Sequence, residues 1–203
     1  MRTGKRSWRG VAGLAVLLAL VGAAPAAAAA AGGAKTRTET VDPWTAGGKL
    51  KPGVMIAGDV KGTCWTSSIA VASSEAYRCM TAKSLIYDPC LAPPAKTVTQ
   101  LACMASPWGK VTLFELTAPI ATSAKHANGK PWVWAYQLGN GVRCITATGT
   151  GTLVDKVALN YYCVPGTGWA AIPDKTTEPW TARYAKSPRS KTLKTEKVTT
   201  AWY

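Results

Sequence analysis

Residues 132–164 read WVWAYQLGNGVRCITATGTGTLVDKVALNYYCV, and this stretch contains three runs rich in β-branched and aromatic residues, at 132–138, 142–148 and 157–164. Such side chains favour extended backbone because they pack well on a pleated sheet. Glycine-rich segments at 139–141 and 149–151 separate the runs, and glycine supplies the positive φ that tight reversals need. The stretch therefore predicts three strands joined by tight turns.

The same strand-like composition recurs on both sides of this stretch. Further runs occupy residues 54–57, 63–71, 111–116, 180–184 and 194–202. One segment differs: Ser74 can cap a short helix near 74–82, whose face would carry Ala76, Cys79 and Met80. The sequence thus predicts a mainly β fold, either a β-sandwich or barrel-like, with one short helix near 74–82.

Six cysteines stand after residue 60, and an even number favours complete pairing into three disulfides. Cys144 and Cys163 lie in two strand-like runs separated by a turn, so they can meet across neighbouring strands. By the same neighbour rule we predict Cys64–Cys79 and Cys90–Cys103. A metal site is not expected, because the chain has no C-x-x-C motif and a single histidine.

Residues 1–31 have the three parts of a secretory signal peptide. A basic opening precedes an apolar run at 11–21, and a run of small residues follows at 23–31. We predict cleavage near Ala31, which makes the mature protein secreted and extracellular. No later apolar run is long enough to span a membrane, so no transmembrane span is expected in the mature chain.

Composition divides the remaining chain into two parts. Residues 32–52 are rich in glycine, lysine and threonine and offer little to bury, so they are expected to form a flexible arm. Residues 53–203 contain all six cysteines and most of the strand-like runs. They are expected to form a single disulfide-rich β domain.

The chain is strongly basic, with 24 Lys and Arg against 10 Asp and Glu. Loss of the leader leaves 20 basic and 10 acidic residues and a net charge of +10. The last 29 residues carry half of that charge, and the candidate binding cations there are Arg183, Lys191, Lys194 and Lys197. An exported basic protein meets anionic wall polymers and surfaces, whereas nucleic acid is not expected as a partner.

Tryptophan is used heavily, with nine residues against one phenylalanine. Trp132, Trp134 and Tyr136 alternate, which places all three on one face of a strand. If that face is buried, the rings belong to the core. If it is exposed, they are candidate binding residues that stack on sugar rings. The sequence leaves both alternatives open.

No arrangement of residues calls for an enzyme, and we predict no catalytic residue and no cofactor. The only histidine, His126, lies in a polar loop, where a solvated surface role is expected. Carboxylates for a hydrolase would have to come from Asp88, Glu115 or Asp155. A hydrolase is the least favoured alternative.

One resemblance covers residues 60–203. It rests on the motifs Cys64-Trp65-Thr66, Tyr77-Arg78-Cys79-Met80, Ile86-Tyr87-Asp88-Pro89-Cys90, Gly141-Val142-Arg143-Cys144 and Tyr161-Tyr162-Cys163. This framework resembles a group of uncharacterised secreted proteins of actinobacteria. The resemblance implies export and a shared cysteine framework, and it transfers no activity and no catalytic residue.

The sequence therefore favours a secreted, non-catalytic domain that binds anionic cell-envelope material or glycans. The alternative is a protein–protein interaction module, such as an inhibitor of an extracellular hydrolase. Its docking element would be the segment 83–95, because rigid loops lose little entropy on binding.

Overall fold

The computed structural model of the chain describes residues 34–121 and 132–203. Within these residues the protein is all-β, with no helix. The predicted leader at 1–31 and the surface role of His126 lie outside the described residues. The strands are β1 (Arg37–Glu39), β2 (Ile56–Ser67), β3 (Ala76–Thr81), β4 (Ile86–Leu91), β5 (Gln100–Met104), β6 (Val111–Leu116), β7 (Ala135–Leu138), β8 (Arg143–Thr146), β9 (Thr152–Val154), β10 (Val157–Leu159), β11 (Tyr161–Val164), β12 (Gly168–Ala170), β13 (Thr181–Ala185) and β14 (Lys194–Trp202).

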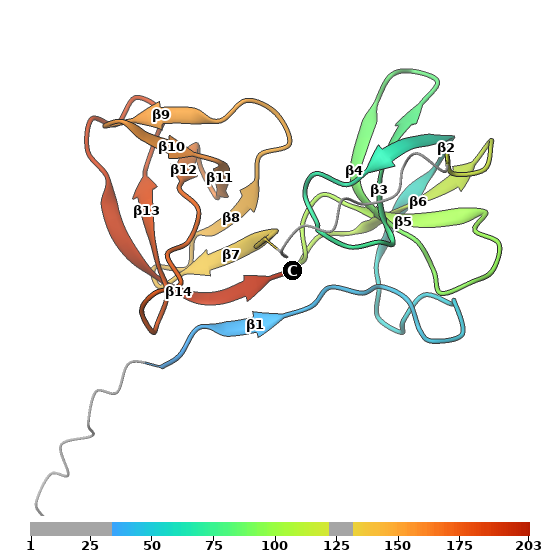
Figure 1. Ribbon diagram of the computed structural model, residues 1–203, viewed down its shortest axis with the longest axis horizontal. Coiled ribbons are helices and arrows are strands. Elements are labelled where there is room, and N and C mark those ends of the chain that lie inside the picture. Colours follow the sequence, from blue (N-terminus) through green and yellow to red (C-terminus); the bar gives the residue numbers. More distant parts are fainter. Residues whose placement is uncertain (1–33, 122–131) are drawn as a thin grey trace, which may run out of the picture. The chain divides into compact units, whose positions relative to one another are not determined.

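The first sheet is a closed barrel of strands β2 to β6 (Figure 1). Four antiparallel pairings follow chain order, and a parallel pairing of β2 with β6 closes the ring. Gly62 lies where β2 passes between β3 and β6. A Cβ at this position would come within 2.1 Å of the Met80 carbonyl oxygen and 2.7 Å of the Phe114 ring, so only glycine allows this close approach.

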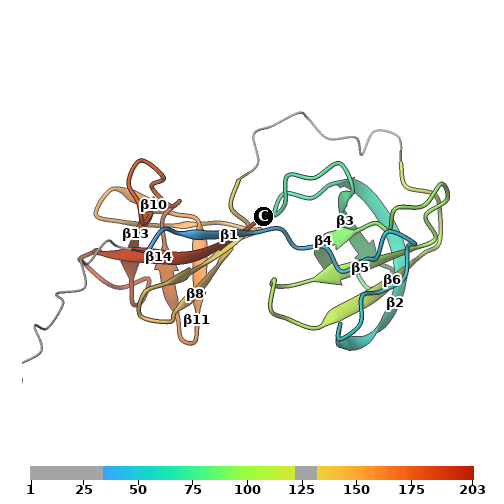
Figure 2. The same cartoon turned by 90° about the horizontal axis from the view of Figure 1, so that it is seen from below.

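The second sheet has the order β1-β14-β13-β12-β11-β8-β7 (Figure 2), and a further pairing joins β14 to β7 and leaves β1 outside the ring. The long strand β14 makes this closure possible. Its residues 194–197 pair with β13, and its residues 198–202 pair with β7. Strand β1 lies parallel to the end of β14, and β9 and β10 form a separate hairpin. Closure of the second sheet therefore depends on one strand that pairs with different neighbours along its length.

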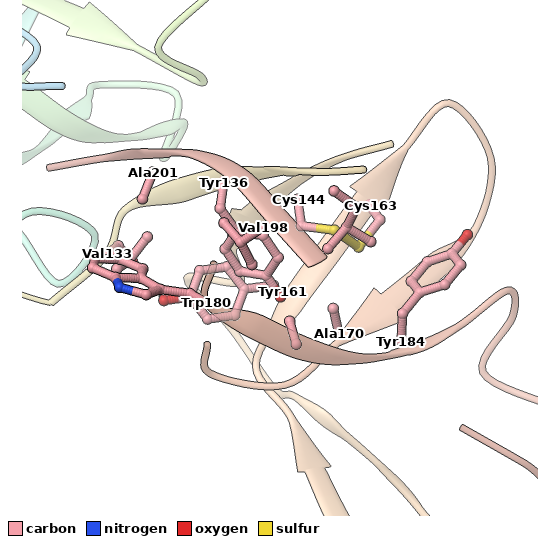
Figure 3. Close-up of a cluster of buried hydrophobic side chains, with 12 residues drawn as sticks. Val133, Tyr136, Cys144, Tyr161, Cys163, Ala170, Trp180, Tyr184, Val198 and Ala201 are labelled. Carbon is pink, nitrogen blue, oxygen red and sulfur yellow. A yellow bond between two sulfur atoms is a disulfide. The ribbon is translucent and has the colours of Figure 1, made fainter. Parts of the chain in front are cut away.

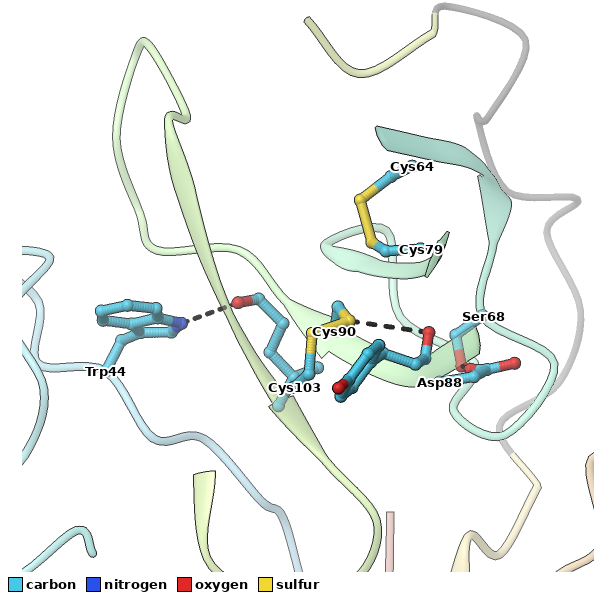
Figure 4. Close-up of a disulfide and its surroundings, with 9 residues drawn as sticks. Trp44, Cys64, Ser68, Cys79, Asp88, Cys90 and Cys103 are labelled. Atoms are coloured by element: carbon cyan, nitrogen blue, oxygen red, sulfur yellow. Dashed lines mark hydrogen bonds between the residues drawn. A yellow bond between two sulfur atoms is a disulfide. The ribbon is translucent and has the colours of Figure 1, made fainter. Parts of the chain in front are cut away.

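All three predicted disulfides are confirmed: Cys64–Cys79, Cys90–Cys103 and Cys144–Cys163. Each joins two residues that face each other across adjacent antiparallel strands. Figure 4 shows the first two disulfides and Figure 3 the third. The predicted β-rich, barrel-like, disulfide-stapled fold class is likewise confirmed.

The core of the second sheet contains two tyrosines that are fully buried but have satisfied hydroxyl groups (Figure 3). The rings of Tyr136 and Tyr161 lie 4.8 Å apart. The Tyr136 hydroxyl donates to the Ala171 carbonyl at 2.7 Å, and the Tyr161 hydroxyl donates to the Val133 carbonyl at 2.5 Å. Because a buried hydroxyl without a partner costs free energy, these bonds allow large amphipathic rings to fill the core.

The short helix predicted near 74–82 is wrong, because Ala76–Thr81 forms strand β3. The predicted face contained Ala76 and Cys79, and both are buried. They are buried in different clusters, Ala76 with Trp44 and Cys79 with Phe114, so they lie on opposite sides of β3. A strand that is buried on both sides therefore reproduces a spacing that is typical of a helix.

The prediction of a flexible arm at 32–52 is wrong for the part that the structure describes. Strand β1 pairs with Thr200–Trp202, and Trp44 is only 4% exposed. The Trp44 indole N–H donates to the Leu91 carbonyl at 2.9 Å (Figure 4). One anchored tryptophan and one short strand thus hold a segment whose composition suggested mobility.

We expect the Cys144–Cys163 disulfide to contribute about 3 kcal/mol to the free energy of unfolding, because it closes a loop of 19 residues. The double variant Cys144→Ala/Cys163→Ala removes it without leaving a free thiol. Urea unfolding followed by tryptophan fluorescence measures the difference. Equal stability of the variant and the wild type would contradict this expectation.

Candidate binding site

The predicted binding cations lie on the hairpin of β13 and β14 and on the loop between these strands, and all four are exposed. In the register, Thr181 faces Lys197 and Arg183 faces Thr195. Since side chains alternate along a strand, Arg183 and Lys197 project from the same outer face. Lys194 projects from the opposite face, and Lys191 lies in the loop. The structure thus brings two of the four predicted residues onto one face; we call this face of β13 and β14 the basic face.

The predicted cations of this hairpin form no ion pair with the described residues, although Glu196 lies on β14 between Lys194 and Lys197. Of the ion pairs among the described residues, none includes Arg183, Lys191, Lys194 or Lys197. The nearby carboxylate of Glu178 is occupied, since it accepts hydrogen bonds from the Trp180 indole at 3.0 Å and the Thr36 N–H at 3.0 Å. The hairpin therefore carries uncompensated positive charge.

The aromatic ladder does not share one face, so that prediction is wrong. Trp134 is 1% exposed and packs with Ile145, whereas Tyr136 is fully buried in the other core of the second sheet with Tyr161. Trp132 is 39% exposed, and its indole N–H donates to the Ala70 carbonyl at 3.0 Å. The alternation fails because β7 begins only at Ala135, after an irregular segment. Two of the three rings are therefore core.

Asp88, a candidate acid, lies on β4 and holds the turn that begins at Ser68 (Figure 4). Its carboxylate accepts from the Ser68 hydroxyl at 2.5 Å and from the Ile69 N–H at 3.2 Å. The Ser68 oxygen in turn accepts from the N–H groups of Ala70 and Val71, at 3.0 and 2.9 Å. With 2% of its side chain exposed, Asp88 holds this turn and is not presented to solvent.

The other candidate acids lie apart from Asp88 in the fold. Glu115 is on β6, where it pairs with Lys61 at 2.9 Å, and Asp155 is in the turn between β9 and β10. Among residues 34–121 and 132–203, no three His, Cys, Asp or Glu side chains gather as metal ligands. The same residues contain no helix that is long and apolar enough to cross a membrane.

Sequence reasoning missed several contacts between cations and aromatic rings. The Arg78 guanidinium lies 5.9 Å from the centroid of the Trp65 ring, and Arg143 lies 5.1 Å from that of Trp108. Lys175 contacts two rings and donates to the Tyr203 hydroxyl at 2.8 Å. The cation and the ring in each contact lie between 5 and 35 residues apart in the chain, so no local sequence pattern predicts these contacts.

Asp88 should make the protein less stable as the pH rises. Burial raises the pKa of its carboxyl above the usual 3.8, against the opposing effects of the Ser68 and Ile69 hydrogen bonds. The folded chain therefore holds this proton more tightly than the unfolded chain, and the stability gained is lost as the pH rises from 3.8 through the raised pKa. As the pH rises through this range, the free energy of unfolding of the wild type should fall relative to that of the Asp88→Asn variant.

Asp174 provides the matched control for this measurement. Hydrogen bonds from Thr176 lower the pKa of its carboxyl, so the difference between the wild type and Asp174→Asn should change with pH in the opposite sense. Urea unfolding at a series of pH values measures both differences. A difference for Asp88→Asn that does not vary with pH would contradict the prediction.

The four candidate cations are exposed, whereas Trp134 and Tyr136 lie in the core. The resemblance to secreted actinobacterial proteins stays a prediction. No protein-family model, no curated protein and no solved structure matches the chain.

Proposed function

We propose that this protein is a secreted, non-catalytic extracellular protein that binds anionic cell-envelope polymer through the exposed cations of the β13–β14 hairpin, two of which form the basic face. The observation that carries the proposal is the set of exposed hairpin cations without carboxylate partners among the described residues. Such a surface attracts polyanions over about one Debye length, roughly 8–10 Å at physiological ionic strength. Binding of this kind is weakened by salt.

The arrangement of the basic face suits an extended polymer. Thr181 and Thr195 alternate on the outer side of the two strands with Arg183 and Lys197. Their hydroxyls add neutral hydrogen-bonding groups between the charges. A strand face of this kind offers a row of contacts to a repeating ligand and does not enclose a small one.

Stacking on sugar rings plays a minor part in the proposal. Trp132 is the one member of the predicted ladder with an exposed ring, and its indole N–H is already bonded to Ala70. Recognition of glycans would therefore rest on charge and hydroxyl contacts more than on aromatic stacking.

A protein partner is the second candidate, and the hairpin of β3 and β4 favours it. Met80, Leu85 and Ile86 are 37%, 55% and 50% exposed there, and Met80 faces Ile86 across the strands. The segment 83–95, expected as a rigid loop, in fact contains β4. A partner that covers these apolar side chains would form a stoichiometric complex that high salt does not dissociate.

The test is co-sedimentation of the oxidised protein, produced from the full chain, with isolated bacterial cell wall across a salt series. We expect Lys191→Ala/Lys194→Ala/Lys197→Ala to weaken pelleting at low salt. At about 1 kcal/mol for each cation near an anionic surface, the loss is on the order of 100-fold. Pelleting of the wild type should also fall as salt rises.

The matched control is Lys83→Ala/Lys96→Ala/Lys110→Ala, which removes the same charge from exposed lysines around the first sheet. It should pellet more strongly than the hairpin variant. Wall stripped of its anionic polymer by acid should not bind the wild type. Equal losses in the two triple variants would show that net charge and not the hairpin determines binding, and pelleting on stripped wall would refute the anionic ligand.

A further inference from the structure

A cavity of about 450 Å³ lies beside β3 and β4 and is separate from the basic face. Its lining combines charged, hydroxyl and apolar groups: Arg78, Ile86, Asp88, Trp134, Thr146 and Tyr162. This volume falls within the range of small-molecule sites, which is roughly 300–1,000 Å³. None of the cations of the basic face lines it. The cavity is thus a second candidate site of a different kind.

Arg78 is the most unusual group in this cavity, because its hydrogen-bonding capacity is hardly used. A guanidinium offers five N–H donors. Its contact with the Asp88 carboxylate is 3.8 Å long, which exceeds hydrogen-bond distance, and its Nε is buried without a hydrogen-bond partner among the described residues. Native proteins rarely leave guanidinium donors unpaired, and 20% of the Arg78 side chain is exposed, so an acceptor from outside the chain can reach it there.

Neighbouring side chains hold the Arg78 guanidinium in place and leave its charge available. The Trp65 ring supports it at 5.9 Å. The Asp88 carboxylate is 2% exposed and bonded to Ser68 and Ile69, whereas 20% of the Arg78 side chain is exposed. Burial also raises the pKa of Asp88, which favours its neutral form. For a ligand in the cavity, the Arg78 guanidinium is therefore more accessible than the Asp88 carboxylate.

The remaining lining suits the body of an organic ligand. Ile86 is 50% exposed and Tyr162 is 37% exposed, and both lie on the cavity. Tyr162 faces the lining residue Ile145 across β11 and β8, so an aromatic and an aliphatic surface adjoin. The Tyr162 hydroxyl makes no hydrogen bond to the described residues, and it can bond a polar substituent.

We propose that this cavity binds a small ring-bearing organic acid, with its carboxylate on the Arg78 guanidinium and its ring against Ile86 and Tyr162. A carboxylate matches the planar fork of a guanidinium in two parallel hydrogen bonds. Sugar acids and aromatic acids share this chemistry, and the test separates them. The proposal does not depend on the basic face or on binding to envelope polymer.

Calorimetric titration of the oxidised protein uses two acids, cellobiouronate and 4-hydroxyphenylacetate, with their uncharged counterparts cellobiose and 4-hydroxyphenylacetamide. At least one acid should bind, and its neutral counterpart should bind at least about tenfold more weakly, as expected for a lost charge-assisted hydrogen bond. The acid that binds identifies the source of the ligand. Binding of neither acid, or equal binding of an acid and its neutral counterpart, would overturn the proposal.

The variant Arg78→Gln should abolish binding of the acid, and Arg78→Lys should weaken it because lysine keeps the charge but lacks the fork. Arg143→Gln is the matched control, since Arg143 also stacks on a tryptophan but does not line the cavity. Circular dichroism and thermal unfolding confirm that each variant is folded. An Arg78→Gln protein that is folded and binds like the wild type, or an Arg143→Gln protein that loses binding to the same degree, would refute the assignment.

Discussion

The register of the strands is fixed covalently, and much of the structure depends on this constraint. Each disulfide joins two cysteines that face each other across adjacent antiparallel strands. A slip of one residue would turn the paired sulfur atoms to opposite faces of the sheet, which the covalent bond forbids. Arg78 precedes one of these cysteines directly, and Asp88 lies two residues before another. The same bonds therefore position the cavity side chains.

Disulfide pairing could be predicted because its signals are local. Cys144 and Cys163 lie in neighbouring strand-like runs, and a turn signal stands between them. Closure of the sheets could not be predicted. The parallel pairing of β2 with β6 and that of β1 with β14 connect segments far apart in the chain, and neither carries a sequence signature that names its partner. Local composition gives strands, whereas long-range pairing is decided by the whole core.

Predictions from periodicity failed where neighbouring residues of one segment are buried in different clusters. Ala76 and Cys79 lie on opposite sides of β3 and are both buried, and this spacing of three imitates a helix. An irregular approach to β7 divided Trp134 and Tyr136 between two cores. Charge was the more dependable guide to the candidate site, because long cationic side chains stay at the surface on either face of a strand. No sequence pattern predicted the Arg78 cavity, because residues far apart in the chain line it.

The heavy use of tryptophan has a structural explanation. Within the described residues, four indole N–H groups bond to oxygen atoms. Three of these bonds connect segments remote in sequence, Trp44 to Leu91, Trp132 to Ala70 and Trp202 to Glu39, whereas Trp180 bonds to Glu178. Phenylalanine would supply apolar surface but no donor, so tryptophan both fills the ends of small sheets and satisfies polar groups there. Because these rings serve the fold, their number is no measure of glycan stacking, and the case for an envelope ligand rests on charge.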